Sequence, residues 1–492
     1  MADQPTPTDT VSLPEATTST AVVPRATTWV VWALFVLSVG ALAVRGGTEW
    51  SVPGLFVVDG LTVVMWVVVT FFSGIVHSYS RRYMAGDAHR DAFFGRVFAF
   101  TLVVLTLTAA DHLALFALAW LAMGLVMSSL IGHAQGWPQA QAAAGLARRY
   151  FLASSGLLTV ALSLLAWGTG STAISGILGS VDALSGPVAL AAAACLLGAA
   201  MIQSALFPFQ TWLLSSMTAP TPASALMHAG FVNAGGILLT RFAPLLVETP
   251  SVMSLAVVVG ALSALIGQAL LLVQTDVKRE LGASTLAQMG FMILQCGLGF
   301  FAAAVTHLVL HGFYKAYLFL SSGTGVEQTV PSDGTHARLT VPRVAVSLVT
   351  ALGGGVLFAV LTGKGLALNS GAVLALVVVL TTLHAARDIL RRPTLTPWVR
   401  LVAVPLVVVS AVGVYGVLFN AIAALLADVP MTKSPTELSV VHLGVAAAFV
   451  VAYLVTEFDL HRSSDRLYVA LLNLSQPAPT TLLTQKEDYD DA

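Results

Sequence analysis

Long apolar runs, separated by short polar segments, dominate this chain and restrict what it can fold into. Each run is long enough to cross a hydrocarbon core about 30 Å thick as a helix. Fourteen such runs lie near residues 28–45, 54–78, 93–110, 112–132, 150–168, 187–207, 223–246, 252–274, 281–299, 301–321, 342–362, 370–390, 401–426 and 438–458. They lack the alternating segments of about ten residues that are typical of outer-membrane β-barrels. The sequence therefore predicts an all-α polytopic membrane protein with about fourteen transmembrane helices.

The composition excludes the soluble classes of protein. Only 10% of the 492 residues are charged and 57% are hydrophobic, with a mean hydropathy of +0.86. Average soluble domains carry about 25% charged residues, so a soluble enzyme or a disordered chain is excluded. A net charge of −1 leaves no basic field that would attract nucleic acid. Cys195 and Cys296 lie in apolar runs, which favours small buried residues over a disulfide or a metal site.

The chain divides into one transmembrane domain and two polar tails. Residues 1–27 are rich in Thr, Pro and Ala and lack the basic segment and short apolar core of a signal peptide, which predicts a disordered tail. Residues 28–458 form the predicted transmembrane domain. Residues 459–492 form a short C-terminal tail with an acidic end.

The distribution of Lys and Arg predicts the orientation. If each loop is numbered by the run that it follows, four basic residues lie in or beside odd-numbered loops: Arg45, Arg241, Lys364 and Lys433. Sixteen lie in even-numbered loops: Arg81, Arg82, Arg90, Arg96, Arg148, Arg149, Lys278, Arg279, Arg338, Arg343, Arg387, Arg391, Arg392, Arg400, Arg462 and Arg466. Loops rich in basic residues remain on the cytoplasmic side. Both termini are therefore expected to be cytoplasmic.

A few ionisable residues inside the predicted spans mark a candidate proton or ion path. Charged groups at membrane depth are costly and usually face a protein interior or a water path. His307, His311 and Lys315 recur every four residues, which places them on one helix face. His228 follows a proline-rich segment, and Lys364 lies in a glycine-interrupted one. Simpler alternatives remain, because His228 could be a packing histidine and Lys364 could extend to the interface.

Five further polar residues are secondary candidates. Asp59 opens the second run, where a charge at a helix N-terminus is the simpler interpretation. Asn233 follows His228 by five residues. The remaining three are Gln203, Lys278 and His384.

Two segments, 203–208 and 361–365, place a proline or glycine break beside polar residues in separate halves of the chain. Paired broken helices are typical of inverted-repeat transporters, because unwound backbone is tolerated only where it lines a cavity. The sequence contains no nucleotide-binding loop, zinc-ligand spacing or nucleophile elbow. We therefore expect a transporter subunit, not an enzyme, that uses an ion gradient and holds no cofactor of its own.

Three segments, 203–229, 274–291 and 307–320, resemble the central motifs of the proton-translocating membrane subunits of respiratory complex I and Mrp antiporters, the NuoL/NuoM type. The resemblance runs from about Phe56 to about Leu390. It implies two inverted five-helix repeats with broken helices and a mid-membrane series of lysines, histidines and a glutamate that carries protons. Five residues fall on the polar positions of the family: His228, His307, His311, Lys315 and Lys364.

Two polar positions of the family are not retained. The family glutamate follows a tryptophan, but here Leu121 follows Trp120. The family lysine precedes the first helix break, where this chain has Gln203. The pair that modulates the first half-channel is therefore absent, which disfavours a respiratory pump.

Finer similarities favour one branch of the family. Segments 148–155, 228–236, 294–300 and 314–323 resemble DabB, the membrane subunits of an inorganic-carbon accumulation complex. The resemblance implies a peripheral DabA-like partner that is similar to zinc-dependent β-carbonic anhydrases, so zinc is expected in that partner.

Three functional hypotheses follow. In the first, the chain conducts protons or Na⁺ in a bacterial inner membrane and drives CO2/bicarbonate accumulation by the partner. In the second, it is a proton-translocating subunit of a complex I-like or Mrp-type antiporter complex. In the third, it is a non-conducting scaffold for a peripheral enzyme.

Overall fold

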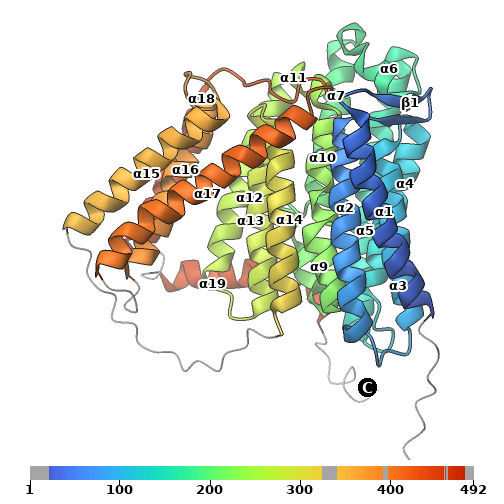
Figure 1. Cartoon of the computed structure of the whole chain (residues 1–492), viewed down its shortest axis with the longest axis horizontal. Coiled ribbons are helices and arrows are strands. Elements are labelled where there is room, and N and C mark those ends of the chain that lie inside the picture. The colour runs from blue at the N-terminus through green and yellow to red at the C-terminus, as the bar shows by residue number, and fades with distance from the viewer. Residues whose placement is uncertain (1–21, 324–340, 392–396, 459, 461–463, 483–492) are drawn as a thin grey trace, which may run out of the picture.

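The computed structural model describes residues 22–323, 341–391, 397–458, 460 and 464–482. Nearly all of the described elements are helices (Figure 1). The N-terminal helices are α1 (Val22–Arg45), α2 (Gly60–Tyr83), α3 (Arg90–Ala109), α4 (Leu113–Ile131), α5 (Pro138–Thr169), α6 (Ile174–Leu178) and α7 (Gly186–Gln203). The central helices are α8 (Thr211–Ser215), α9 (Thr221–Ala229), α10 (Ala234–Arg241), α11 (Ala243–Val247), α12 (Pro250–Leu271), α13 (Val277–Gly297) and α14 (Phe301–Ser321). The C-terminal helices are α15 (Val341–Thr362), α16 (Gly371–Arg391), α17 (Pro397–Leu425), α18 (Val440–Glu457) and α19 (Asp465–Leu474).

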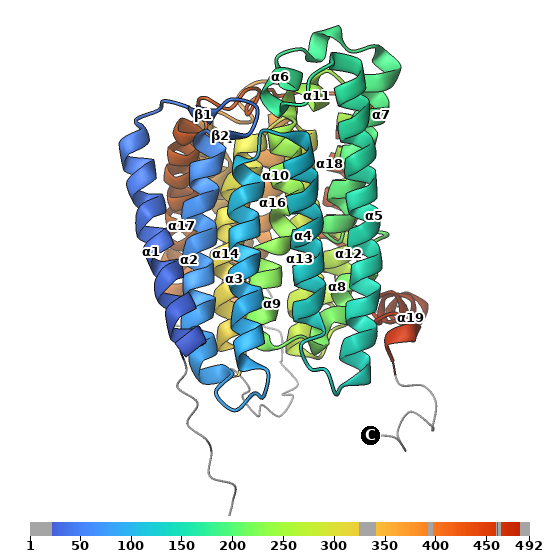
Figure 2. The same ribbon diagram turned by 90° about the vertical axis from the view of Figure 1, so that its right-hand side faces the viewer.

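The helices confirm a multi-pass membrane protein. Each predicted apolar run overlaps a helix, and 11 helical segments of the described chain are long and apolar enough to cross a membrane. Helices α13 and α14 are not among them, because the polar and charged residues that they carry lower their hydropathy. Helix α14 occupies the middle of the bundle, where it contacts α2, α9 and α10 on one side and α13 and α17 on others. Figure 2 shows the N-terminal helices in front of this centre.

Of the two predicted helix breaks, only the one at 203–208 interrupts a series of helices; the segment predicted as a break at 361–365 lies in the connection between two neighbouring spans, α15 and α16, which pack against each other. The chain is not helical at 204–210, between α7 and α8, or at 363–370, between α15 and α16. Ser263 Oγ accepts from Phe207 N in the first segment at 3.1 Å, and Ser370 N in the second segment donates to the Thr436 carbonyl at 2.9 Å. A second break, which was not predicted, is a 3₁₀ turn over Phe231–Asn233 that separates α9 from α10. Irregular backbone is stable at membrane depth when protein groups satisfy it in this way.

Several helix boundaries differ from the predicted ones. Helix α1 begins at Val22, inside the predicted tail, because Val22 and Val23 are apolar and Pro24 is tolerated in a first helical turn. The second span begins at Gly60, not near residue 54, since the preceding residues form the hairpin β1 (Trp50–Val52) and β2 (Phe56–Val58). In the C-terminal tail, α19 lies across the lower end of the bundle (Figure 1).

Two ion pairs join distant helices at the end of the bundle where α2 begins. Arg241, the last residue of α10, pairs with Asp59, which caps α2 by accepting from Thr62 N at 2.9 Å. The same guanidinium donates to the Thr108 carbonyl of α3 at 2.9 Å. Arg45, at the end of α1, pairs with Asp428 beyond α17. Asp59 is therefore placed as a helix cap and an ion-pair partner, in agreement with the simpler interpretation of its sequence position.

Candidate functional site

The three polar residues of α14 lie on one helix face, as their spacing predicts. The His307 and His311 rings are stacked, with centroids 6.0 Å apart and planes inclined by 17°. Lys315, fully buried one turn further, donates from Nζ to the Leu281 carbonyl of α13 at 2.9 Å. Three ring nitrogens have no hydrogen-bond partner among the described residues: both of His311, and Nε2 of His307. These nitrogens are therefore available to bind a proton or water.

His228 of α9 completes this group through a hydrogen-bonded link. Its Nδ1 lies 2.9 Å from Thr285 Oγ1 on α13, and the Thr285 hydroxyl donates to the Leu281 carbonyl at 2.8 Å. A hydroxyl has one proton to donate, so Thr285 accepts from His228 Nδ1. The Leu281 carbonyl also accepts from Lys315. Helix α13 thus connects His228 to Lys315, and His228 Nε2 is left as the basic nitrogen without a partner in the described structure.

The four residues are all basic and lie close enough for their positive charges to repel one another. His311 interacts with the charges of His307, Lys315 and His228, while His228 also interacts with Lys278. Lys278 donates to the Ala219 carbonyl at 3.1 Å and so lies at the end of the bundle where α13 begins. Glu280 on the same first turn interacts with Lys315. The group therefore has a basic and an acidic side chain at its Lys315 end.

Lys364 does not join this group but lies at the opposite end of α14, inside a cage of aromatic rings. Its Nζ is 3.4 Å from the ring centroid of Phe419 and between 5.5 and 5.7 Å from those of Phe300, Phe358 and Tyr415. Lys364 is 1% exposed, and its Nζ has no hydrogen-bond acceptor among the described residues. Ring faces attract the cation without accepting its proton in a hydrogen bond, so the ammonium remains available to another acceptor.

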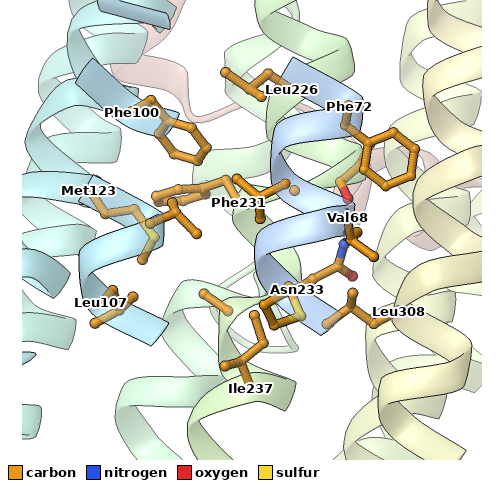
Figure 3. A pocket seen from close by; sticks show the side chains of 16 residues that line it. Val68, Phe72, Phe100, Leu107, Met123, Leu226, Phe231, Asn233, Ile237 and Leu308 are labelled. Carbon is orange, nitrogen blue, oxygen red and sulfur yellow. Dashed lines mark hydrogen bonds between the residues drawn. The ribbon is translucent and has the colours of Figure 1, made fainter. Parts of the chain in front are cut away.

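The secondary candidates fall in separate places. Gln203 is fully buried at the end of α7, and neither amide atom has a partner in the described structure. Asn233 donates to the Ala229 carbonyl at 2.7 Å and lines an enclosed cavity of about 30 Å³ with apolar side chains (Figure 3). A cavity of this size admits water, and the unpartnered Asn233 Oδ1 is a suitable acceptor for it. His384 is exposed on α16.

Sequence reasoning did not identify the residues that organise these side chains. Thr285 gives no motif signal, because a threonine in an apolar helix usually bonds its own backbone. The cage rings come from α15, α17 and the residue before α14, so no local pattern joins them. One part of the cage did leave a signal in the sequence: Tyr415 and Phe419 lie four residues apart and therefore share a helix face.

We expect Thr285→Val to separate His228 from Lys315. Valine keeps the shape of threonine but leaves His228 Nδ1–H buried without an acceptor, which costs about 1–3 kcal/mol. The measurement is the unfolding temperature in detergent together with proton flux into proteoliposomes. Thr285→Ser, which keeps the hydroxyl, is the matched control. If Thr285→Val equals the unmodified protein in both measurements, the link has no role.

Comparison with known proteins identifies the family. Residues 110–339 match the family described as "NADH:quinone oxidoreductase/Mrp antiporter, TM", and residues 48–94 match "NADH-Ubiquinone oxidoreductase (complex I), chain 5 N-terminus". Over 426 residues the chain is 30% identical to the probable inorganic carbon transporter subunit DabB2 of Halothiobacillus neapolitanus, covering 85% of this chain and 77% of that protein. The chain belongs to the DabB family.

Two further similarities bear on the DabB assignment. The probable inorganic carbon transporter subunit DabB1 of Halothiobacillus neapolitanus is 40% identical over 294 residues, which are 58% of this chain. The chain spans only 52% of the length of that relative. The Mrp complex from Dietzia sp. DQ12-45-1b shares the fold at a TM-score of 0.59 and 24% identity, covering 93% of this chain and 51% of the other.

The tryptophan that precedes Leu121, the residue at the expected glutamate position, makes a structural contact in this DabB-family chain. Trp120 is buried and donates from Nε1 to Ser154 Oγ at 3.1 Å, and Ser154 donates to the Ala199 carbonyl at 2.9 Å. Leu121 is half-buried. This part of the bundle is held by a neutral hydrogen-bond series that links α4, α5 and α7.

Proposed function

We propose that the chain is the membrane subunit of an inorganic-carbon accumulation complex and conducts protons along α14 to drive a partner subunit. Membership of the DabB family supports the carbon substrate, because the relatives above are named inorganic carbon transporter subunits. The observation that carries the conducting role is the buried series on α14, in which His307, His311 and Lys315 present free or weakly paired nitrogens. Such groups are costly at membrane depth and an anchor would not need them.

The series is long enough for a path across much of the membrane. Lys364 contacts the ring of Phe300, the residue before α14, and Lys315 lies fifteen residues further along the helix, a rise of about 22 Å. A hydrocarbon core is about 30 Å thick. The two lysines therefore stand near opposite ends of α14, with the stacked histidines between them.

The chemistry of the series favours protons over Na⁺. Its members are nitrogen bases, which bind protons, whereas a hard cation prefers oxygen ligands. The carboxylate whose charge acts on Lys315 is that of Glu280, which is exposed on the first turn of α13. We infer that Glu280 and Lys278 face the compartment from which Lys315 exchanges protons.

The same proposal includes fourteen transmembrane helices arranged as two inverted five-helix repeats. The break at 204–210 and the 3₁₀ turn at Phe231–Asn233 support the broken helix of the first repeat, and the family resemblance supports the second repeat. The bias of Lys and Arg supports a bacterial inner-membrane location with both termini cytoplasmic. The proposed partner is a DabA-like peripheral protein that carries the zinc.

Purification and uptake together test this function. We expect the tagged chain to co-purify with one soluble zinc-containing polypeptide, and carbon-dependent growth at ambient CO2 to require both chains. A protonophore that spares growth at high CO2 should abolish growth at ambient CO2. A set of redox or antiporter subunits in the purified complex would contradict the carbon-uptake role. Uptake that continues with the protonophore would leave only the scaffold role.

A further inference from the structure

An apolar groove of about 360 Å³ opens to the outside of the bundle between α2 and α14. It is lined chiefly by Phe71, Phe72, Ile75, Phe313, Tyr317 and Leu320. Since the protein lies in a membrane, this face is bathed by lipid hydrocarbon. An α-helix has a diameter of about 10–12 Å, so a groove of this size is too small to seat a partner helix and suits a thinner apolar chain.

Aromatic rings close one end of the groove. The Phe313 ring lies 5.0 Å from Phe72 and 5.4 Å from Phe71, and Phe71 in turn contacts Phe35 of α1 at 5.6 Å. At the other end the lining finishes with Ser321, the last residue of α14. The groove is thus closed by apolar side chains near mid-helix and leads toward polar residues at the helix ends.

Two basic side chains lie on α2 about 9–10 Å beyond Ile75, the last residue of this helix that lines the groove. Arg81 and Arg82 occupy the last turn of α2 and are exposed. Phe71, Ile75 and Arg82 share one face of α2, because their spacing of four and seven residues follows the helical repeat. From Phe71 to Arg82 the helix rises about 16 Å. The groove lining itself extends about 12 Å along α14, from Phe313 to Ser321, which fits within the about 15 Å of one leaflet of the hydrocarbon core.

We propose that this groove holds one acyl chain of an anionic phospholipid whose headgroup pairs with Arg81 and Arg82. The aromatic end receives the chain terminus and the arginines receive the phosphate. The lipid would pack against the side of α14 that exposes Phe313 and Tyr317, while the other side carries His311 and Lys315. It thereby supports the helix that presents the polar series. The site stands on the groove and the arginines and does not depend on the proposed function.

Native mass spectrometry of the purified chain tests the site with two probes of equal chain length, phosphatidylglycerol and phosphatidylcholine. We expect one phosphatidylglycerol to stay bound per chain and phosphatidylcholine to bind weakly. Arg81→Gln/Arg82→Gln should lower phosphatidylglycerol affinity about tenfold or more, since each basic residue near an anionic surface contributes about 1 kcal/mol. Equal binding of both lipids by the unmodified chain would overturn the proposal.

A blocking variant tests the groove itself. Ile75→Trp fills the apolar channel and should abolish lipid retention, whereas Val360→Trp, at a position that is 62% exposed on α15, should retain it. If Ile75→Trp does not fold, Leu320→Trp blocks the groove from the opposite helix. Unchanged retention in the blocked variant overturns the proposal. The proposal would also be overturned if the purified protein is a dimer that Ile75→Trp dissociates. In that case a second copy of the chain, not a lipid, would cover this face.

Discussion

Replacing Lys315 with methionine is expected to abolish proton conduction while leaving the fold intact. Methionine matches the length of the lysine stem and removes a fully buried charge, so the packing around α14 is kept. The loss of a group that transfers protons typically lowers a rate by about 100-fold or more. Proton flux into proteoliposomes and carbon-dependent growth at ambient CO2 measure the effect, and high CO2 should restore growth.

Two controls make the Lys315 result specific. Lys486→Met changes a lysine of the C-terminal tail and should conduct normally. Lys315→His keeps a titratable nitrogen at the position and should recover part of the flux. Normal flux through an assembled Lys315→Met protein would exclude Lys315 from the path and remove the main support for conduction along α14.

The second large effect concerns stability. Asp59→Leu leaves the largely buried charge of Arg241, 11% exposed, without its carboxylate partner, and breaking such a pair costs up to about 3–5 kcal/mol. It also removes the cap of α2, which contributes about 1 kcal/mol. We expect a large fall in the unfolding temperature of the protein in detergent, followed by intrinsic tryptophan fluorescence.

The double variant Asp59→Leu/Arg241→Leu should recover most of that stability, because an apolar pair of similar volume often replaces a buried ion pair without loss. The pair of Arg90 and the exposed Asp91 provides the comparison: its atoms are 3.7 Å apart and Asp91 is 61% exposed. Asp91→Ala should therefore cost less than about 1 kcal/mol. Equal unfolding temperatures for Asp59→Leu and Asp91→Ala would show that the Asp59–Arg241 pair does not hold the helices together.

The length of the apolar runs was sufficient to predict the long helices. Helical spacing was sufficient to predict that the polar residues of α14 share one face. The regular spacing of His307, His311 and Lys315 placed all three on one side of α14 because the helical repeat is local. Long-range partners could not be predicted in this way. Arg241 is 182 residues from Asp59, and the rings around Lys364 come from three separate segments, so only the packed bundle brings them together.

Helix boundaries also depended on more than hydropathy. The hairpin at 50–58 is apolar enough to resemble the start of a span, yet its backbone groups pair with each other before α2 begins. The break at Gly230 was not predicted, because the residues around it remain apolar.

The two ion pairs also explain how arginines are accommodated at the end of the bundle that holds few basic residues. Arg45 and Arg241 are exceptions to the bias of basic residues, and each is matched by a carboxylate, Asp428 and Asp59, from a distant segment. Once paired, each arginine has its charge compensated within the folded bundle. Asp428 lies 383 residues after Arg45, so α1 can be neutralised only after nearly the whole chain has been synthesised. Final docking of the first helix is therefore expected to be a late step of biogenesis.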